Sequence, residues 1–184
     1  MSDHDPVSAI SEAEATGRTA EIFAEIREVM QIPLVTSIWR TLDAIEGGLE
    51  AAWAATRPIY ESGQPDALLA QLRKEIELPT PEPLPAEALN SANLDSKDCE
   101  SITSILAAYN RSNSLNLIAL TALVRNSSSI QLRSVDRPEV KWPTLPPLLS
   151  KAEIDPGNWS LLERTIAMGV NVPTTALPTL WRHL

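Results

Sequence analysis

The sequence predicts an all-α protein, made of one helical bundle repeat followed by the opening helices of a second tandem repeat. Apolar residues recur at the spacing of amphipathic helices, and no run alternates apolar and polar residues as a half-buried strand does. A stretch near the N-terminus also recurs after a proline-rich segment. With 184 residues, of which 43% are hydrophobic, the chain can bury a core of its own.

Three helices with short breaks are expected first. One runs from Thr19 to Gln31, and a second runs from Val35 to Ile45 and ends before Gly47-Gly48. A third follows and stops at Ser62-Gly63. Their apolar faces consist of Ile22, Phe23, Ile26, Val29 and Met30 in the first, Val35, Ile38, Trp39, Leu42 and Ile45 in the second, and Leu49, Ala52, Trp53 and Ile59 in the third.

The next elements are marked by prolines and polar caps. Pro65 suits the first turn of a fourth helix, whereas the four prolines in residues 78–85 predict a stiff, extended connector. Asp95 is the expected N-cap of a further helix, which we expect to end at a turn over residues 110–114. Residues 115–124 are apolar nearly all round, which favours a buried central helix and leaves a strand as the alternative.

Internal similarity divides the chain. Residues 17–33 align without a gap on residues 157–173, and a Trp-Arg pair follows in both copies, at Trp39 and at Trp181. Residues between the copies are polar and proline-rich. The predicted parts are a first helical repeat over 1–126, a linker over 127–156 and the truncated start of a second helical repeat over 157–184.

The last six residues, Thr-Leu-Trp-Arg-His-Leu, resemble the start of an amphipathic helix with nothing after it. We therefore expect an interrupted second repeat, whose apolar side chains either dock on the first repeat or are covered by another chain. The alternative is a C-terminal arm that packs back on its own bundle.

Composition excludes several classes of function. The net charge is -9, and no basic cluster is longer than Arg73-Lys74, so nucleic acid is not an expected partner. The single cysteine, Cys99, leaves no internal disulfide and no Cys-x-x-Cys redox or zinc site, and no metal site is expected. The longest apolar stretch, Leu117 to Val124, is too short to span a bilayer, and the first residues show no basic region followed by an apolar run. We expect a cytoplasmic protein with no membrane partner.

Several motifs together resemble the group I 2-haloacid dehalogenases. They are Glu14-Ala-Thr-Gly-Arg-Thr-Ala-Glu-Ile-Phe23, Ile32-Pro33, Ile38-Trp39-Arg40, Gly47-Gly48-Leu49 and Tyr109-Asn-Arg-Ser-Asn113, with the apolar run from Asn116 to Leu123. The resemblance implies an all-α fold of two tandem repeats with the site between them. It also implies hydrolysis without a cofactor, in which an aspartate activates a water that displaces halide from the α-carbon of a short 2-haloacid.

The resemblance also implies positions for site residues. The family's site asparagine falls on Asn113, and the wall positions, where the family pattern has aromatic residues, fall on Leu34 and Ser37. The position of the catalytic aspartate falls on Leu180, and no Asp or Glu lies between Glu163 and the end of the chain. Because losing a general base costs about 10² to 10⁴ in rate, we expect impaired activity unless another chain supplies a carboxylate.

Two further residues complete the predicted substrate site, and each has a structural alternative. Arg111 could attract an anionic substrate, or it could be a solvated loop residue. Trp39 could line a cavity, or it could simply pack in the core. Asn113 itself could be an N-cap rather than a substrate ligand.

A second class of function is also compatible with the sequence. The chain could be a non-catalytic, dehalogenase-like helical protein that acts as a binding or dimerisation module, or a truncated gene product. The candidate partners are therefore a short 2-haloacid or related carboxylate and a second copy of the chain.

Overall fold

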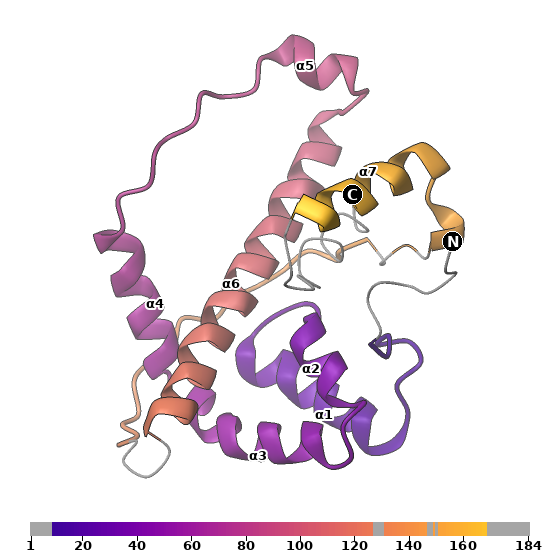
Figure 1. Cartoon of the computed structure of the whole chain (residues 1–184). Helices are drawn as coiled ribbons and strands as arrows, with labels where there is room; N and C mark the ends of the chain where they lie inside the picture. The colour runs from indigo at the N-terminus through magenta and orange to yellow at the C-terminus, as the bar shows by residue number, and fades with distance from the viewer. Residues whose placement is uncertain (1–8, 127–130, 147–148, 150, 169–184) are drawn as a thin grey trace.

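The computed structural model describes residues 9–126, 131–146, 149 and 151–168. These residues form helices and connecting segments and include no strand, which confirms the predicted all-α class (Figure 1). The elements are α1 (Gly17–Met30), α2 (Ser37–Leu42), α3 (Gly48–Glu61), α4 (Gln64–Glu75), α5 (Ala86–Ser91), α6 (Ser96–Asn126), the 3-10 turn η1 (Lys151–Glu153) and α7 (Pro156–Met168). Of the helices that the structure describes, none combines the length and the apolarity that crossing a bilayer requires.

The core lies where α1, α2 and α3 pack together and against the C-terminal half of the long helix α6 (Figure 1). Three aromatic rings form its centre. Trp39 meets Trp53 edge to face at a centroid distance of 5.7 Å, and Tyr60 stacks on Trp53 at 6.0 Å. Helix α6 contributes Leu115 and Ala119, both fully buried. Burial of this apolar surface is the main force that holds the four helices together.

The first helices agree with the prediction except at their ends. α1 begins two residues before the predicted Thr19 and ends at Met30, because Gln31 adopts a left-handed conformation with φ of 50°. α2 is shorter than the predicted span of 35–45, because Ala44 and Ile45 donate to carbonyls only three residues back and the chain then turns through Gly47 at φ of 67°. Ile45, predicted on the apolar face, is consequently 58% exposed.

The connector over residues 76–85 is extended and exposed throughout, as its prolines predict. In Figure 1 it leaves α4, arcs away from the bundle and returns through the short helix α5, which no pattern in the sequence predicted. Pro65 lies in the first turn of α4, as expected.

The predicted turn over residues 110–114 is wrong, because α6 continues through it without a break. Ser112 is fully buried there and bonds to Thr36, so tertiary packing outweighs the weak helix preference of the Asn and Ser residues. The strand alternative for residues 115–124 is also wrong, because the same helix includes them. That segment is also not buried on every side, because Leu117 is 71% exposed and Val124 is 84% exposed.

The start of α6 follows the prediction. The backbone N–H of Asp98 donates to Asp95 Oδ1 at 2.9 Å, and the backbone N–H of Asp95 donates to Asp98 Oδ2 at 3.0 Å. This reciprocal pair satisfies two amides that a helix N-terminus would otherwise leave without partners.

Residues 133–142, which we call the strap, follow α6 in the chain and lie against the C-terminal ends of α1 and α3. The backbone N–H of Val135 donates to the carbonyl of Ser62 at 2.7 Å, and that of Val140 donates to Gln31 Oε1. Gly63 permits this close approach, since its φ is 75° and a Cβ at this position would collide with the carbonyl oxygen of Val135. Part of the predicted linker is thus hydrogen-bonded to the ends of α1 and α3, and the predicted domain division itself stays a prediction.

A buried ionic cluster fixes the strap to α1, α4 and α6. The carboxylate of Asp66 pairs with Arg111 at 2.6 Å and with Arg137 at 3.0 Å, and the side chain of Asp66 is 7% exposed. Arg111 also donates to the carbonyls of Met30 and Gln31, while Arg137 donates to that of Val29. Since these carbonyls form the negative end of α1, the two guanidinium groups cap that helix and neutralise Asp66 together.

Candidate functional site

A small pocket lies between the start of α2 and the middle of α6. Its volume is about 300 Å³, and it is open to solvent on one side. The α6 residues that face the pocket, among them Asn113 and Asn116, recur at intervals of three or four positions, which places them on one side of that helix. The lining consists of Ser37, Ile38, Asn113, Asn116, Leu117, Leu120 and Thr121.

The structure brings together two of the five predicted substrate-binding residues. Ser37 and Asn113 both line the pocket, from α2 and α6 respectively. Trp39 does not line the pocket. It is fully buried in the core, and its indole N–H donates to Asn116, which does line it. Asn113 is exposed in the middle of α6, so the alternative reading of it as an N-cap is wrong.

The other two predicted residues lie elsewhere. Leu34 precedes α2 and is buried in a separate apolar cluster with Ile105, Ala108 and Tyr109, against which Trp142 of the strap packs. Arg111 pairs with Asp66 and donates to the carbonyl of Met30 at the end of α1, and its side chain is only 11% exposed. It is therefore neither a solvated loop residue nor a lining residue of this pocket.

The floor of the pocket belongs to a buried polar network centred on Asn116. Trp39 Nε1 donates to Asn116 Oδ1 at 3.1 Å, and the Tyr60 hydroxyl donates to the same oxygen at 2.9 Å. Asn116 Nδ2 donates to Thr36 Oγ1 at 3.1 Å, and Thr36 shares a further hydrogen bond with Ser112. All five residues are at most 4% exposed, so the network replaces the water that these groups would otherwise need.

Burial raises the pKa of the Tyr60 phenol, because the ionised form would lose its hydration. The hydroxyl therefore stays protonated at neutral pH and keeps donating to Asn116. The network is neutral throughout, and neutral groups cost less to bury than charges do.

Neither Asn116 nor Tyr60 was among the predicted site residues. The available signal was the spacing of Ser112 and Asn116, two polar residues four positions apart within a long apolar helix. That signal was concealed by the predicted turn, which placed the two residues on different elements.

None of the described residues that line the pocket is acidic. The position that the family resemblance assigns to the catalytic aspartate, Leu180, lies outside the described residues, as do Trp181 and the end of the chain. No three His, Cys, Asp or Glu side chains converge within the part of the chain that the structure describes.

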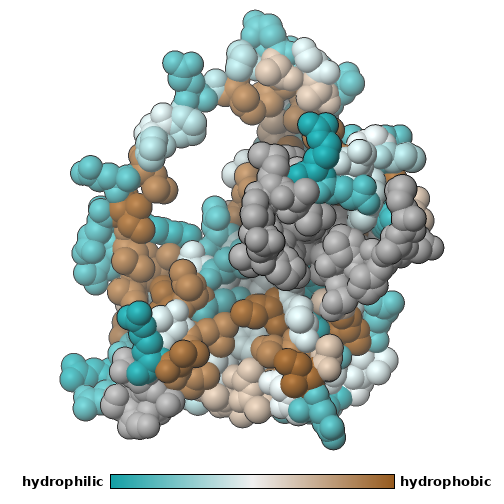
Figure 2. Space-filling model, in the orientation of Figure 1, coloured by the Kyte–Doolittle hydropathy of each residue, from teal (hydrophilic) through white to brown (hydrophobic). Residues whose placement is uncertain are grey.

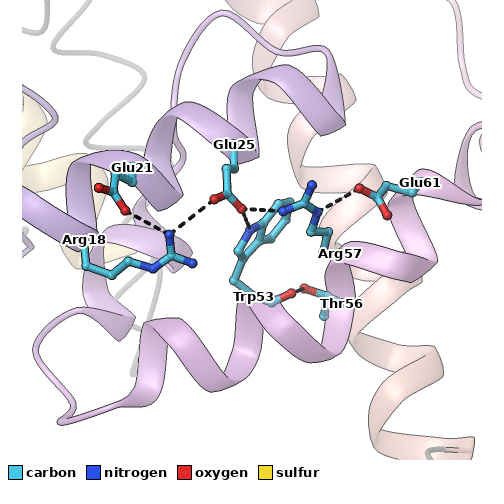
Figure 3. A network of polar contacts seen from close by, with 7 residues as sticks. All are labelled: Arg18, Glu21, Glu25, Trp53, Thr56, Arg57 and Glu61. Carbon is cyan, nitrogen blue, oxygen red and sulfur yellow. Dashed lines mark hydrogen bonds and ion pairs between the residues drawn. The ribbon is translucent and has the colours of Figure 1, made fainter.

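A second polar cluster lies on the outer face of α1 and α3, and Figure 3 shows its members. Glu25 accepts from Trp53 Nε1 at 2.8 Å and pairs with Arg57 at 2.8 Å and Arg18 at 3.4 Å. The hydrogen bond from Trp53, followed by the two cations, lowers the pKa of the Glu25 carboxyl. A carboxylate with a lowered pKa and three donors is a poor general base, so this cluster has a structural role.

Exposed apolar surface accompanies α4 and the connector that follows. Leu68 is 42% exposed and Ile76 is 53% exposed, and Figure 2 shows brown, hydrophobic surface along α4. Scattered apolar residues of this kind are normal on a protein surface and do not by themselves define a site.

No family model matches the chain. The chain is 29% identical over 133 residues to a configuration-inverting 2-haloacid dehalogenase from Alcaligenes xylosoxydans xylosoxydans. The match covers 71% of this chain and 44% of that protein, so the chain spans less than half the length of its relative. The comparison supports, at the level of the family alone, a distant relationship between this chain and the haloacid dehalogenases.

Proposed function

We propose that this chain binds short 2-haloacids or related carboxylates in the pocket between α2 and α6, as part of a hydrolytic dehalogenation site that needs no cofactor. One observation supports the proposal most: Ser37 and Asn113 line the same pocket, in a chain with a distant dehalogenase relative. The pocket suits a ligand with a small apolar body and a polar group, because Ile38, Leu117 and Leu120 line it beside two amides.

The proposed reaction is a single displacement at the α-carbon. A carboxylate takes a proton from water, the water oxygen forms a bond to the α-carbon, and the carbon–halogen bond breaks with its electron pair leaving on the halide. Attack from the side opposite the halogen inverts the configuration, in keeping with the name of the relative. The carboxylate must come from outside the described lining of the pocket, and we therefore propose that activity is impaired unless a second chain completes the site.

Chloride release from D- and L-2-chloropropionate by the purified chain tests this proposal, with heat-killed protein as the blank. Release above the blank is expected at high protein concentration, with an inverted hydroxyacid as the product. Replacing Asn113 with Ala should abolish the release, whereas Asn90→Ala on the exposed face of α5 should not change it. Equal release by the Asn113 variant would remove that residue from the site.

A non-catalytic role as a binding or dimerisation module is the second candidate. The exposed Leu117 and Val124 on α6 favour it, because burying them against another chain would remove apolar surface from water. Light scattering at increasing protein concentration tests it, and a strict monomer would reject the dimerisation form.

A further inference from the structure

We propose that Asn116 determines which ligands the pocket accepts, by donating one amide hydrogen to the carboxylate of the bound acid while Tyr60 and Trp39 hold its amide in place. This inference rests on the proposed function, since it names the group that recognises the acid. Asn116 opens one of the motifs that carry the family resemblance, but no role was predicted for it, and the assignment comes from its hydrogen bonds and its place in the pocket.

The orientation of the Asn116 amide is fixed by its neighbours. An indole nitrogen can only donate, so the atom that faces Trp39 Nε1 at 3.1 Å must be the amide oxygen. The Tyr60 hydroxyl donates to the same oxygen at 2.9 Å. With both donors on Oδ1, the NH₂ group points to the other side, and a flipped amide would place it against the indole N–H.

The NH₂ group then has one hydrogen to spare. It carries two hydrogens, and Thr36 Oγ1, at 3.1 Å, is the one acceptor that it meets among the described residues. Asn116 also lines the pocket, while its residue exposure is only 4%. A donor at the floor of a largely apolar pocket favours a ligand that brings an acceptor, because a ligand without one would leave the amide hydrogen unpaired.

A carboxylate suits this donor better than a neutral acceptor does. A hydrogen bond to an ionised oxygen is about twice as strong as one between neutral groups. Asn113 lies three residues earlier on α6, on the same side of the helix, and provides a second amide at the exposed mouth of the pocket. The two asparagines can therefore share one carboxylate, and the alkyl and halogen part then faces Ile38, Leu117 and Leu120.

Calorimetric titration of the whole chain with propionate, an unreactive analogue, tests the assignment. Asn116→Asp keeps the size of the side chain but replaces the donors with a carboxylate, and we expect propionate affinity to fall about tenfold or more. Tyr60→Phe removes only the hydroxyl that orients Asn116 and adds no charge, and we expect a loss of about threefold. Asn90→Asp, an exposed substitution on α5 with the same change of charge, should bind propionate as the unmodified chain does.

Each result has one meaning. Unchanged propionate affinity in folded Asn116→Asp would overturn the assignment, as would an absence of saturable binding by the unmodified chain. If circular dichroism shows that Asn116→Asp does not fold, Tyr60→Phe decides, and unchanged affinity in that variant overturns the assignment. Binding that depends on Asn116 without any halide release would reject the proposed dehalogenation alone, whereas halide release with unchanged binding in the variants would reject the role of Asn116 alone.

Discussion

Two adjacent tryptophans in the core send their indole N–H groups to very different partners. The rings of Trp39 and Trp53 are 5.7 Å apart, and both residues are at most 2% exposed. Trp39 donates inward to the neutral amide of Asn116, whereas Trp53 donates outward to the carboxylate of Glu25, which also pairs with two arginines (Figure 3).

The difference between the two partners decides which region can act on a ligand. The Glu25 carboxylate is already paired with Arg18, Arg57 and the Trp53 indole, and solvent reaches the two arginines, so a ligand gains little free energy by binding there. The Asn116 network is neutral and almost fully buried, and the Asn116 amide retains a donor beside a pocket. Burial of a neutral group with unused bonding capacity therefore marks the site more clearly than a concentration of charge does.

Replacing Asn116 with Leu should have the largest effect of the three changes that probe this comparison. It leaves the Trp39 indole N–H and the Tyr60 hydroxyl without their acceptor in the core. We expect a loss of about 3 kcal/mol in the free energy of unfolding, because each buried unpaired donor costs about 1–3 kcal/mol. Urea denaturation measures it, with the exposed Asn113→Leu as a control that should be nearly neutral. A loss no larger than that of the control would remove the energetic contrast between the two regions.

Replacing Asp66 with Asn sharpens the comparison, because Asp66 is charged like Glu25 but buried like Asn116. Arg111 and Arg137 would keep their bonds to the end of α1 and lose the opposite charge between them. We expect a loss of about 2 kcal/mol, less than for a buried pair whose remaining partner has no other acceptor. Glu75→Gln, an exposed substitution on the same helix, serves as the control in the same denaturation assay. If Asp66→Asn were neutral, burial would not decide the cost of losing a charge in this protein.

Replacing Glu25 with Gln should have the smallest effect, less than about 1 kcal/mol near neutral pH, as for exposed ion pairs. The lowered pKa of Glu25 means that its contribution is complete above the ordinary value of 4.5 and disappears as the pH falls through its value in the folded state. Unfolding curves recorded from pH 7 downward should show the variant and the unmodified chain converging below about pH 4.5. A difference that grew toward low pH would contradict the assigned direction, and Glu28→Gln on the exposed side of α1 provides the baseline.

Much of the fold follows from local signals in the sequence. The apolar spacing from Ile22 to Met30, the proline of the first turn of α4 and the cap at Asp95 all predicted what the structure shows. These features depend on residues only a few positions apart, and a linear reading captures such relations well.

The pocket could be predicted only in part, because it depends on contacts between distant residues. Ser112 falls in the predicted turn and Asn116 in the apolar segment after it, and only the approach of Thr36, Trp39 and Tyr60 joins the two polar side chains in one network. In the same way, the family resemblance grouped Leu34 with Ser37, but only Ser37 lines this pocket, while Leu34 packs beside Tyr109.

The contacts at the end of α1 have a consequence for folding while the chain is being synthesised. The carbonyl end of α1 finds its partners far later in the sequence, 81 residues on at Arg111, 108 residues on at Arg137 and 111 residues on at Trp142. A ribosome adds residues from the N-terminus at about 5–20 per second, so the first helices emerge many seconds before these partners exist. During that interval their apolar face lacks Leu115 and Ala119, and such transiently exposed apolar surface is prone to aggregation.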